Sequence, residues 1–262
     1  MTTLARLKAL ATAILPIRSM ASRALQDRAM VVTLHRVNDV NAGDGLTLSS
    51  AEFEDHCRFL SDHFDVVSLA EIVQRLEGGV SFDRQVAITF DDGYLDNYEV
   101  AAPILARHGL HATFFVSTGF IETDVVAPWD LDMPAAPGWM TWDQVRGLHD
   151  QGFAIGGHTI DHVDLGEVAG DAARLQLTNS REVLRERLGV DVELFAYPFG
   201  RSDNITEANR SLVREVGFRC CASCFGGFVE AGTSPFALPR FAISSWRASK
   251  DRFAFDMAFG RL

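Results

Sequence analysis

The stretch VAITFDDGY, residues 86–94, predicts both the fold and the centre of the functional site. Its first five residues are apolar, β-branched or aromatic, a pattern typical of a buried strand. Asp91 and Asp92 follow at the end of that strand, where buried charge is costly unless it is used. A turn at Gly93 would bring both carboxylates to one cleft, one as a metal ligand and the other as a base. The alternative is ordinary turn chemistry, for which Asp-Asp-Gly is well suited.

A second short apolar run, residues 153–157, is followed directly by His158 and His162. Two histidines four residues apart share a face if the segment is helical, and neutral imidazole binds borderline metals such as zinc. One carboxylate with two histidines is a known catalytic zinc set. On its own the pair is also compatible with a polar surface turn. Because the ends of parallel strands gather at one face of an α/β fold, we expect the histidines near Asp91 and Asp92.

A third apolar run, residues 192–197, closes in Pro198, Phe199 and Gly200. Proline and glycine end a strand, and the loop that follows can offer backbone N–H groups to a ligand. A plain strand-to-loop turn is the alternative.

Together, TFDDG at 89–93, HTIDH at 158–162 and FAYPFG at 195–200 resemble three motifs of the polysaccharide deacetylase family, also called carbohydrate esterase family four. Order and spacing also fit, and the resemblance covers roughly residues 30–245. It implies an α/β fold, a distorted (β/α) barrel of about seven parallel strands.

The resemblance also implies a site. One divalent metal, expected to be zinc, would be bound by Asp92, His158 and His162. Asp91 would be the base that removes a proton from the attacking water. Contacts to the substrate or its oxyanion would come from Tyr197, Pro198, Phe199 and Trp129.

Two departures from the family pattern concern the acid. Ala196 stands where the third motif usually carries arginine, and Arg240 stands where a Leu-x-His motif usually supplies the general acid. Arginine is a poor proton donor. His35, at the end of the first predicted strand, is therefore the candidate acid, and Arg240 is expected to be a charge partner that holds Asp91 ionised.

The implied activity is removal of N-acetyl groups from an N-acetylated amino sugar or polysaccharide by a metal-dependent hydrolase. Two alternatives remain open. One is a different metal-dependent amide hydrolase on the same fold, acting on a small cyclic amide or a lipid-linked sugar. The other is a carbohydrate-binding domain without catalytic activity.

The loop of residues 118–140 is long and contains Trp129 and Trp139. Loops of this length inside a compact domain are usually functional. We expect it to form a substrate wall, with an indole stacking on a sugar ring; a surface insertion that merely covers the barrel is the alternative.

The chain has 262 residues and a net charge of −11, with no long basic run, which argues against a nucleic-acid partner. We expect one catalytic domain, residues 29–262. Residues 1–28 form a basic amphipathic segment that is expected to associate with a membrane surface or pack on the domain. The four cysteines, expected to be reduced thiols, fit a cytoplasmic location, and the basic segment fits a membrane-peripheral one. A signal peptide in residues 1–25 would instead mean secretion. The oligomeric state does not follow from the sequence.

Overall fold

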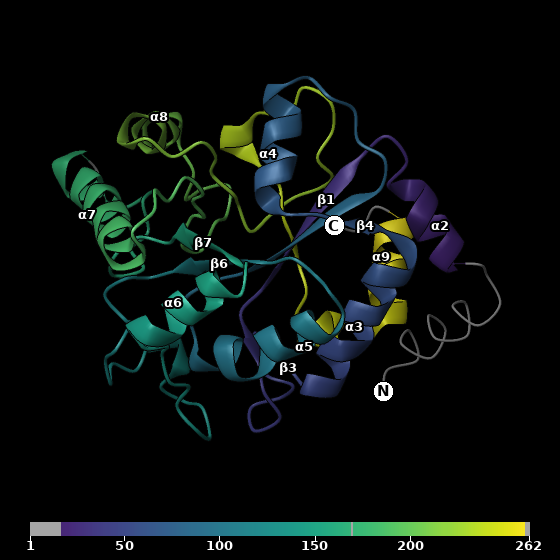
Figure 1. The fold of residues 1–262 in the computed structure, drawn as a ribbon, viewed down its shortest axis with the longest axis horizontal. Helices are drawn as coiled ribbons and strands as arrows, with labels where there is room; N and C mark the ends of the chain where they lie inside the picture. Colours follow the sequence, from purple (N-terminus) through teal and green to yellow (C-terminus); the bar gives the residue numbers. More distant parts are fainter. Residues whose placement is uncertain (1–16, 169, 260–262) are drawn as a thin grey trace.

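The computed structural model describes residues 17–168 and 170–259, and its centre is a parallel β-sheet wrapped by helices (Figure 1). The strand order is β7-β6-β5-β1-β8, and β4 pairs with the first two residues of β5. The bounds are β1 Ala29–Leu34, β4 Asp65–Val66, β5 Gln85–Phe90, β6 Thr113–Val116, β7 Ala154–Gly157 and β8 Phe241–Ala242. A small separate sheet pairs β2 Arg36–Val37 with β3 Thr47–Leu48.

Beyond β7 the wall of the sheet continues through single parallel bridges. Gly157 bridges Phe195, Ala196 bridges Ala222, and Ala222 bridges Leu238. The segment from Leu238 leads into β8, which pairs with β1 and so closes the ring. The strands β1, β5, β6 and β7 provide four wall segments, and the three bridged segments bring the total to seven. This confirms the predicted distorted barrel.

Residues 218–222, like the apolar run 192–197, are typical in sequence of a full barrel strand, and for both segments that prediction is wrong. Among the described residues these segments form isolated bridges and no extended ladder. The reason lies in their flanks: Pro198 and Gly200 turn the backbone away after the first run, and Gly217 turns it directly before the second. Both glycines have positive φ.

Helices form where the sequence carries caps. The side chains of Ser49, Thr141 and Thr206 each accept a hydrogen bond from the backbone three residues later, in a complete capping box. The helices are α2 Ile17–Ala24, α3 Ser50–His63, α4 Leu69–Glu77, α5 Ala102–Arg107, α6 Trp142–Asp150, α7 Gly170–Leu188, α8 Glu207–Val216 and α9 Lys250–Ala258, with a π-helical turn at Asn97–Ala101 before α5.

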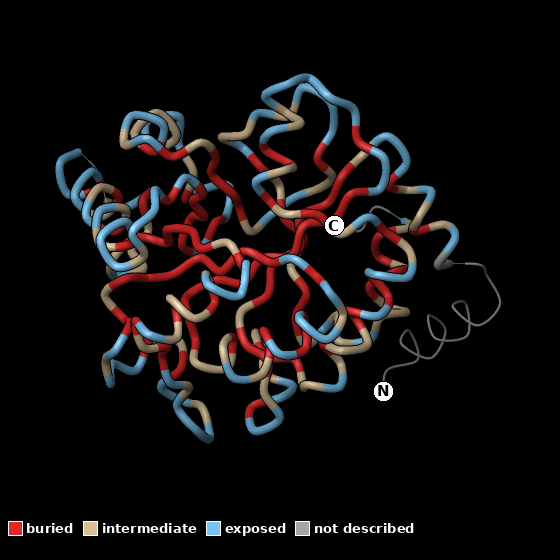
Figure 2. The backbone as a smooth tube through the Cα atoms, viewed as in Figure 1, coloured by how far each residue is buried: buried red, intermediate tan, exposed pale blue. Residues whose placement is uncertain are grey.

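The barrel strands are buried on both faces, as Figure 2 shows by the red path through the middle of the molecule. All six residues of β1 and all six of β5 are buried. Parallel strands covered by helices on one side and by core residues on the other read as continuous apolar runs, which is why these two strands could be predicted.

The described part of the amino-terminal segment packs against the carboxyl-terminal helix. Helix α2 packs on α9, and Ala21 and Leu25 are fully buried in the core. The predicted basic segment, residues 1–28, therefore includes a helix packed on the domain; residues 1–16 lie outside the described residues. None of the described helices is long and apolar enough to cross a membrane.

Candidate active site

The two adjacent carboxylates lie at the carboxyl end of β5, and both are almost fully buried. Asp92 has φ +78° and Gly93 has φ +95°, so two consecutive residues adopt left-handed backbone conformations. The sequence placed this turn at Gly93 alone. A left-handed aspartate is uncommon, and such backbone strain concentrates at functional sites. The turn breaks the alternation of the strand and gives the two carboxylates different neighbours.

Asp91 is held by a buried arginine. Arg240 donates from Nη1 to Oδ1 at 2.8 Å and from Nη2 to Oδ2 at 2.7 Å, and Thr33 donates to Oδ2 at 3.2 Å. Burial on its own would raise the pKa of Asp91, but the charge of Arg240 outweighs it and the pKa is lowered. Asp91 is therefore ionised near neutral pH, with the charge partner that the sequence predicted.

Asp92 faces the two histidines. Its Oδ1 lies 3.3 Å from Nε2 of His158 and 3.2 Å from Nε2 of His162. Burial would raise the pKa of Asp92, but His162 and His158 lower it well below its usual range. The site thus brings together the three residues that the sequence proposed as metal ligands, and leaves Asp91 outside the group.

These three side chains fit a metal ion. Their candidate ligand atoms all lie within 4.8 Å of one another, and all three residues are buried. Oδ1 of Asp92 accepts no hydrogen bond from the described residues, although both imidazole nitrogens are close. Two ligands at about 2.0–2.1 Å from a tetrahedral zinc ion would lie about 3.3 Å apart. The spacing therefore suits a shared ion better than a hydrogen-bonded cluster.

The histidines do not lie on a helix, so that part of the sequence argument is wrong. Residues 158–162 form an irregular bend, in which Thr159 has φ +64° and His162 has φ +51°. It is these two left-handed residues, and not a helical turn, that direct both rings toward Asp92.

His35 directly follows β1, is partly buried, and lies close enough to Asp91 and Asp92 to interact with their charges. Burial lowers the pKa of His35, while Asp92 and Asp91 oppose that effect. A lowered pKa favours the neutral imidazole in the resting site. The structure thus places His35 near the carboxylates, but its proton would have to arrive during the reaction.

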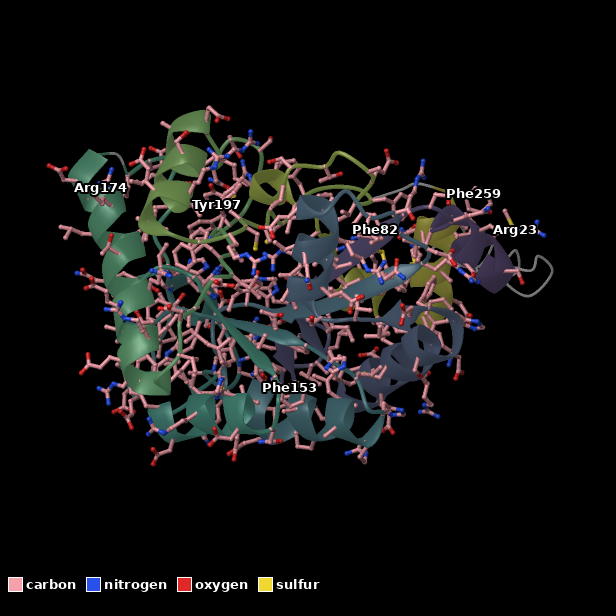
Figure 3. The ribbon with its side chains drawn as sticks, turned by 45° about the horizontal axis from the view of Figure 1, so that its top comes forward. Arg23, Phe82, Phe153, Arg174, Tyr197 and Phe259 are labelled. Carbon is pink, nitrogen blue, oxygen red and sulfur yellow. The ribbon has the colours of Figure 1, made fainter. Side chains whose placement is uncertain are left out.

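The third motif divides into parts with different surroundings. Phe199 is 47% exposed with φ +59°, and its ring lies 4.8 Å from the ring of His162. Pro198 is buried. The predicted substrate contact of Tyr197 does not fit the structure: the side chain is 1% exposed and lines a separate pocket with Arg210 and Cys221, close to α8 (Figure 3).

The long loop is folded against the site. Trp129 lies with its ring centroid 4.4 Å from that of His162, as expected for a wall beside the ligands. Trp139, the other predicted stacking residue, is instead 6% exposed and stacked on Tyr94. Three residues that hold this loop were not predicted from the sequence: Tyr94, Asp130 and Arg36. The only signal was the position of Tyr94, directly after the TFDDG motif.

Comparisons with known proteins agree with this geometry. The sequence profile of the polysaccharide deacetylase family matches residues 80–221. YxkH of Bacillus subtilis, named as a polysaccharide deacetylase, is 24% identical over 209 residues, 79% of this chain and 69% of that protein. The poly-β-1,6-N-acetyl-D-glucosamine N-deacetylase of Staphylococcus aureus is 22% identical over 242 residues, 84% of this chain and 80% of that protein.

Solved structures show the same fold. The deacetylase PplD of Streptococcus pyogenes, in complex with acetate, superposes with a TM-score of 0.72 at 22% identity, over 83% of this chain and 93% of that one. IcaB from Ammonifex degensii superposes with a TM-score of 0.71 at 22% identity, over 90% and 98% of the two chains. Since the family profile covers more than half of the sequence and its two acidic and histidine motifs meet at one site, the chain belongs to the polysaccharide deacetylase family.

Proposed function

We propose that this protein is a metal-dependent hydrolase that removes N-acetyl groups from an N-acetylated amino sugar or polysaccharide. The proposal rests on the observation that the adjacent carboxylates of Asp91 and Asp92 have different partners. Asp91 is paired with Arg240, and Asp92 is grouped with His158 and His162. A reaction in which one acid binds a metal and the other accepts a proton needs this separation.

The residues would act in the following way. A divalent ion at Asp92, His158 and His162 would polarise the acetamide carbonyl and make a water more acidic. Asp91 accepts the proton of the water that attacks the carbonyl carbon. The backbone N–H of Phe199 itself is the candidate donor to the negative charge that develops on the carbonyl oxygen, since Pro198 has no N–H and that of Gly200 donates to the carbonyl of Pro198. The C–N bond then breaks, and the proton taken up by Asp91 passes by way of His35 to the departing amine, so that acetate and a free amino sugar are formed.

Arg240 has a positioning role in this scheme. Its guanidinium is fully buried, and the neighbouring Asp91 raises its pKa despite the opposing effect of burial. It therefore stays charged and keeps Asp91 ionised and oriented. Support for a carbohydrate substrate comes from the S. aureus relative, whose name specifies a β-1,6-linked N-acetylglucosamine polymer.

The experiment is acetate release from β-1,6-linked and β-1,4-linked N-acetylglucosamine oligomers, with zinc added in known amounts. Wild type should release acetate in proportion to bound metal. Asp92→Asn, His158→Ala and His162→Ala should lose metal and activity together, whereas Asp91→Asn should keep metal and lose turnover. His111→Ala, at an exposed histidine, is the matched control.

The same assay separates the alternatives. Binding of the oligomers without acetate release by the metal-loaded protein would indicate a carbohydrate-binding domain. Acetate-free turnover of a cyclic amide would indicate a different amide hydrolase. Near-normal acetate release by Asp91→Asn would show that the base lies elsewhere.

A further inference from the structure

The two metal-site histidines are held in place by different means. Nδ1 of His158 lies 2.8 Å from the carbonyl oxygen of Ala196, so its N–H donates there and Nε2 is left to face Asp92. Metal-binding histidines usually have such a partner for the second ring nitrogen, because it fixes the tautomer and the ring orientation. Nδ1 of His162 is buried and has no hydrogen-bond partner among the described residues.

Aromatic rings surround His162 instead. The centroid of Trp129 lies 4.4 Å from that of the imidazole and the centroid of Phe199 lies 4.8 Å away, with interplanar angles of 50° and 70°. Phe199 is nearly half exposed, whereas Trp129 is partly buried and closer to the imidazole. Trp129 therefore has to supply most of the restraint on the ring, and the question is what restrains Trp129.

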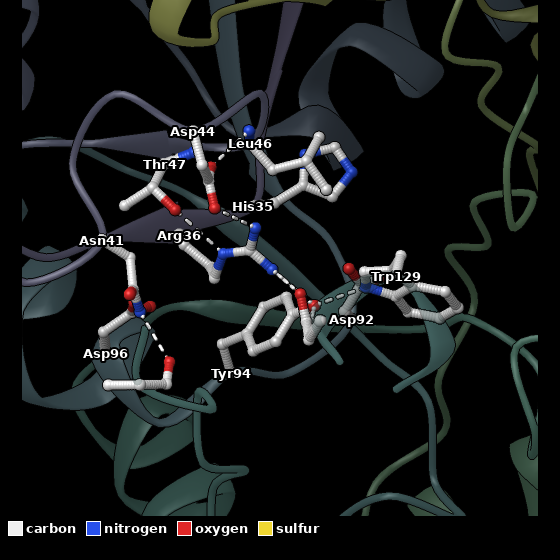
Figure 4. Close-up of polar contacts among 12 residues, drawn as sticks. His35, Arg36, Asn41, Asp44, Leu46, Thr47, Asp92, Tyr94, Asp96 and Trp129 are labelled. Atoms are coloured by element: carbon white, nitrogen blue, oxygen red, sulfur yellow. Dashed lines mark hydrogen bonds and ion pairs between the residues drawn. The ribbon is translucent and has the colours of Figure 1, made fainter. Parts of the chain in front are cut away.

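A single buried hydroxyl fixes the indole. Nε1 of Trp129 donates to Oη of Tyr94 at 2.7 Å, and Nη1 of Arg36 donates to the same oxygen at 2.9 Å. The hydroxyl in turn donates to Oδ2 of Asp130 at 2.8 Å. Figure 4 shows these contacts, with Tyr94 and Arg36 meeting near Trp129. Oη of Tyr94 thus accepts two hydrogen bonds and donates one, which uses all of its hydrogen-bonding capacity.

Arg36 and Asp130, which bond to the Tyr94 hydroxyl, are held by further contacts of their own. Nη1 of Arg36 lies 2.5 Å from Oδ1 of Asp130, and both side chains are at least 98% buried. Arg36 also donates to Thr47 and to Asp44, each at 2.9 Å (Figure 4). The loop that carries Trp129 and Asp130 is thereby tied to the segment that follows β1.

Backbone contacts tie the same loop to the turn that carries Asp92. The N–H of Leu95 donates to the carbonyl of Gly138 at 2.8 Å, and that of Met140 donates to Gly93 at 3.1 Å. Trp139 stacks on Tyr94 with centroids 4.6 Å apart and rings inclined by 18°. The turn that positions Asp92 therefore also positions the loop that places Trp129 against His162.

We infer that Trp129 is a positioning residue for His162, and that Tyr94, Asp130 and Arg36 hold its indole at the imidazole ring. The aromatic contact takes the place of the carbonyl that orients His158. The inference rests on the metal dependence in the proposed function and is independent of the substrate. Its consequence is measured as metal affinity, without any assay of turnover.

The first test compares zinc affinity, by chelator competition, in the wild type, Trp129→Ala, Trp129→Phe and Trp246→Ala. Trp129→Ala should bind zinc ~10–100-fold more weakly, the usual effect of removing a residue that orients a ligand. Trp129→Phe should recover much of the loss because it restores an aromatic ring. Trp246, which is 57% exposed, provides a tryptophan control that should leave affinity unchanged.

Tyr94→Phe tests the link behind the indole. It keeps the ring that stacks on Trp139 and removes only the hydroxyl, so the fold should persist. We expect zinc affinity to fall by ~5-fold, about the contribution of one hydrogen bond. In the Trp129→Ala background the same change should have no further effect, because the two residues act through one contact. Cobalt absorption spectra should report altered coordination geometry in both single variants.

Wild-type zinc affinity in folded Trp129→Ala, or in Tyr94→Phe, would overturn the inference and show that solvent or the backbone orients His162. Full additivity of the two changes would also overturn it. The proposed function fails separately: a wild-type protein that binds zinc and releases no acetate would refute the deacetylase and leave this inference intact.

Discussion

Arg240 binds both carboxylate oxygens of Asp91 in a buried fork, although the two residues are 149 positions apart in the sequence. The guanidinium stands at the position where a family histidine was expected to donate a proton. Its geometry serves another purpose: Nη2 also lies 3.1 Å from Sγ of Cys224, and Nε donates to the carbonyl of Ser223. With all its contacts inside the protein, Arg240 fixes the base and has no access to a leaving group.

Replacing Arg240 with methionine should therefore affect stability and activity together. Asp91 would be left buried without its partner, which typically costs about 3–5 kcal/mol in free energy of unfolding. The pKa of Asp91 would rise, so the fraction of active base at neutral pH would fall. Urea unfolding and kcat, each measured across pH, test this. Arg174→Met on α7 (Figure 3), which breaks the exposed ion pair with Glu215 on α8, is the control and should change stability by only about 0–1 kcal/mol. Unchanged stability in Arg240→Met would contradict the expectation.

His35→Ala should lower kcat by ~10²–10⁴-fold and leave metal content unaltered, because general acid catalysis is typically of that size. His35→Gln separates two roles. Glutamine can hydrogen-bond and orient a neighbour but cannot deliver a proton near neutral pH, so a donor role predicts that both variants are equally slow. Recovery of most of the rate in His35→Gln would show that His35 only orients its neighbours. Metal content of each variant should be measured in parallel.

The protein should lose stability in mild acid through His56, which contacts none of the proposed metal ligands. This imidazole is buried in α3, and its Nε2–H donates to the carbonyls of Arg247 and Ala248, at 3.1 and 2.9 Å. Burial lowers the pKa of His56 from 6.5 to about 4. Between these values the unfolded chain binds a proton and the folded protein does not, so stability falls as pH drops. The full loss would be roughly 3 kcal/mol.

His56→Gln should remove that contribution, and the comparison has to be made between variants. The reason is Asp96, whose pKa burial raises to about 6, so that its effect on stability has the opposite sign in the same pH range. The decrease in free energy of unfolding from pH 7 to pH 4.5 should be smaller in His56→Gln than in wild type. His111→Gln, at an exposed site, is the control, and equal decreases in all three proteins would refute the role of His56.

Two truncations separate the structural and membrane roles of the amino terminus. Removing residues 1–28 deletes Ala21 and Leu25 from the core, and loss of one buried leucine side chain alone typically costs about 2–5 kcal/mol. The domain should therefore remain folded only with a clearly lower Tm. Removing residues 1–16 spares these contacts and deletes Arg6 and Lys8. If the basic segment binds membranes, this shorter truncation should reduce binding to anionic liposomes; unchanged binding would reject that role.

The sequence predicted the parts of the site that depend on local pattern. Asp91, Asp92 and His158 each follow a short apolar run, and parallel strands necessarily bring such ends to one face. The family motifs then supplied the roles. The pairing of Arg240 with Asp91 was predictable as well. Ala196 stands where the third motif usually carries arginine, and Arg240 supplies an arginine where the family usually has histidine.

What could not be predicted depends on long-range packing. The contact between Arg36 and Asp130 joins positions 94 residues apart, and nothing near either residue indicates the other. Nothing in the local sequence indicates the left-handed conformation of His162, because residues other than glycine adopt it in only a small fraction of cases. Tyr197 was placed at the substrate because its motif lies there, whereas strand alternation directs its ring to the opposite side.

The uneven closure of the barrel has a consequence for local opening. Strands β1 and β5 share six consecutive residue pairs, whereas the segments at Ala196 and Ala222 meet through one bridge each. Amide hydrogens of the first region should exchange with solvent only on global unfolding, and those of the second through local fluctuations. Asp91 directly follows the first region, whereas Arg240 lies between Leu238, which bridges Ala222, and the two-residue strand β8. The ion pair of Asp91 and Arg240 therefore joins a strongly paired part of the wall to a weakly paired one, and local opening of the weaker part should disturb the orientation of the base.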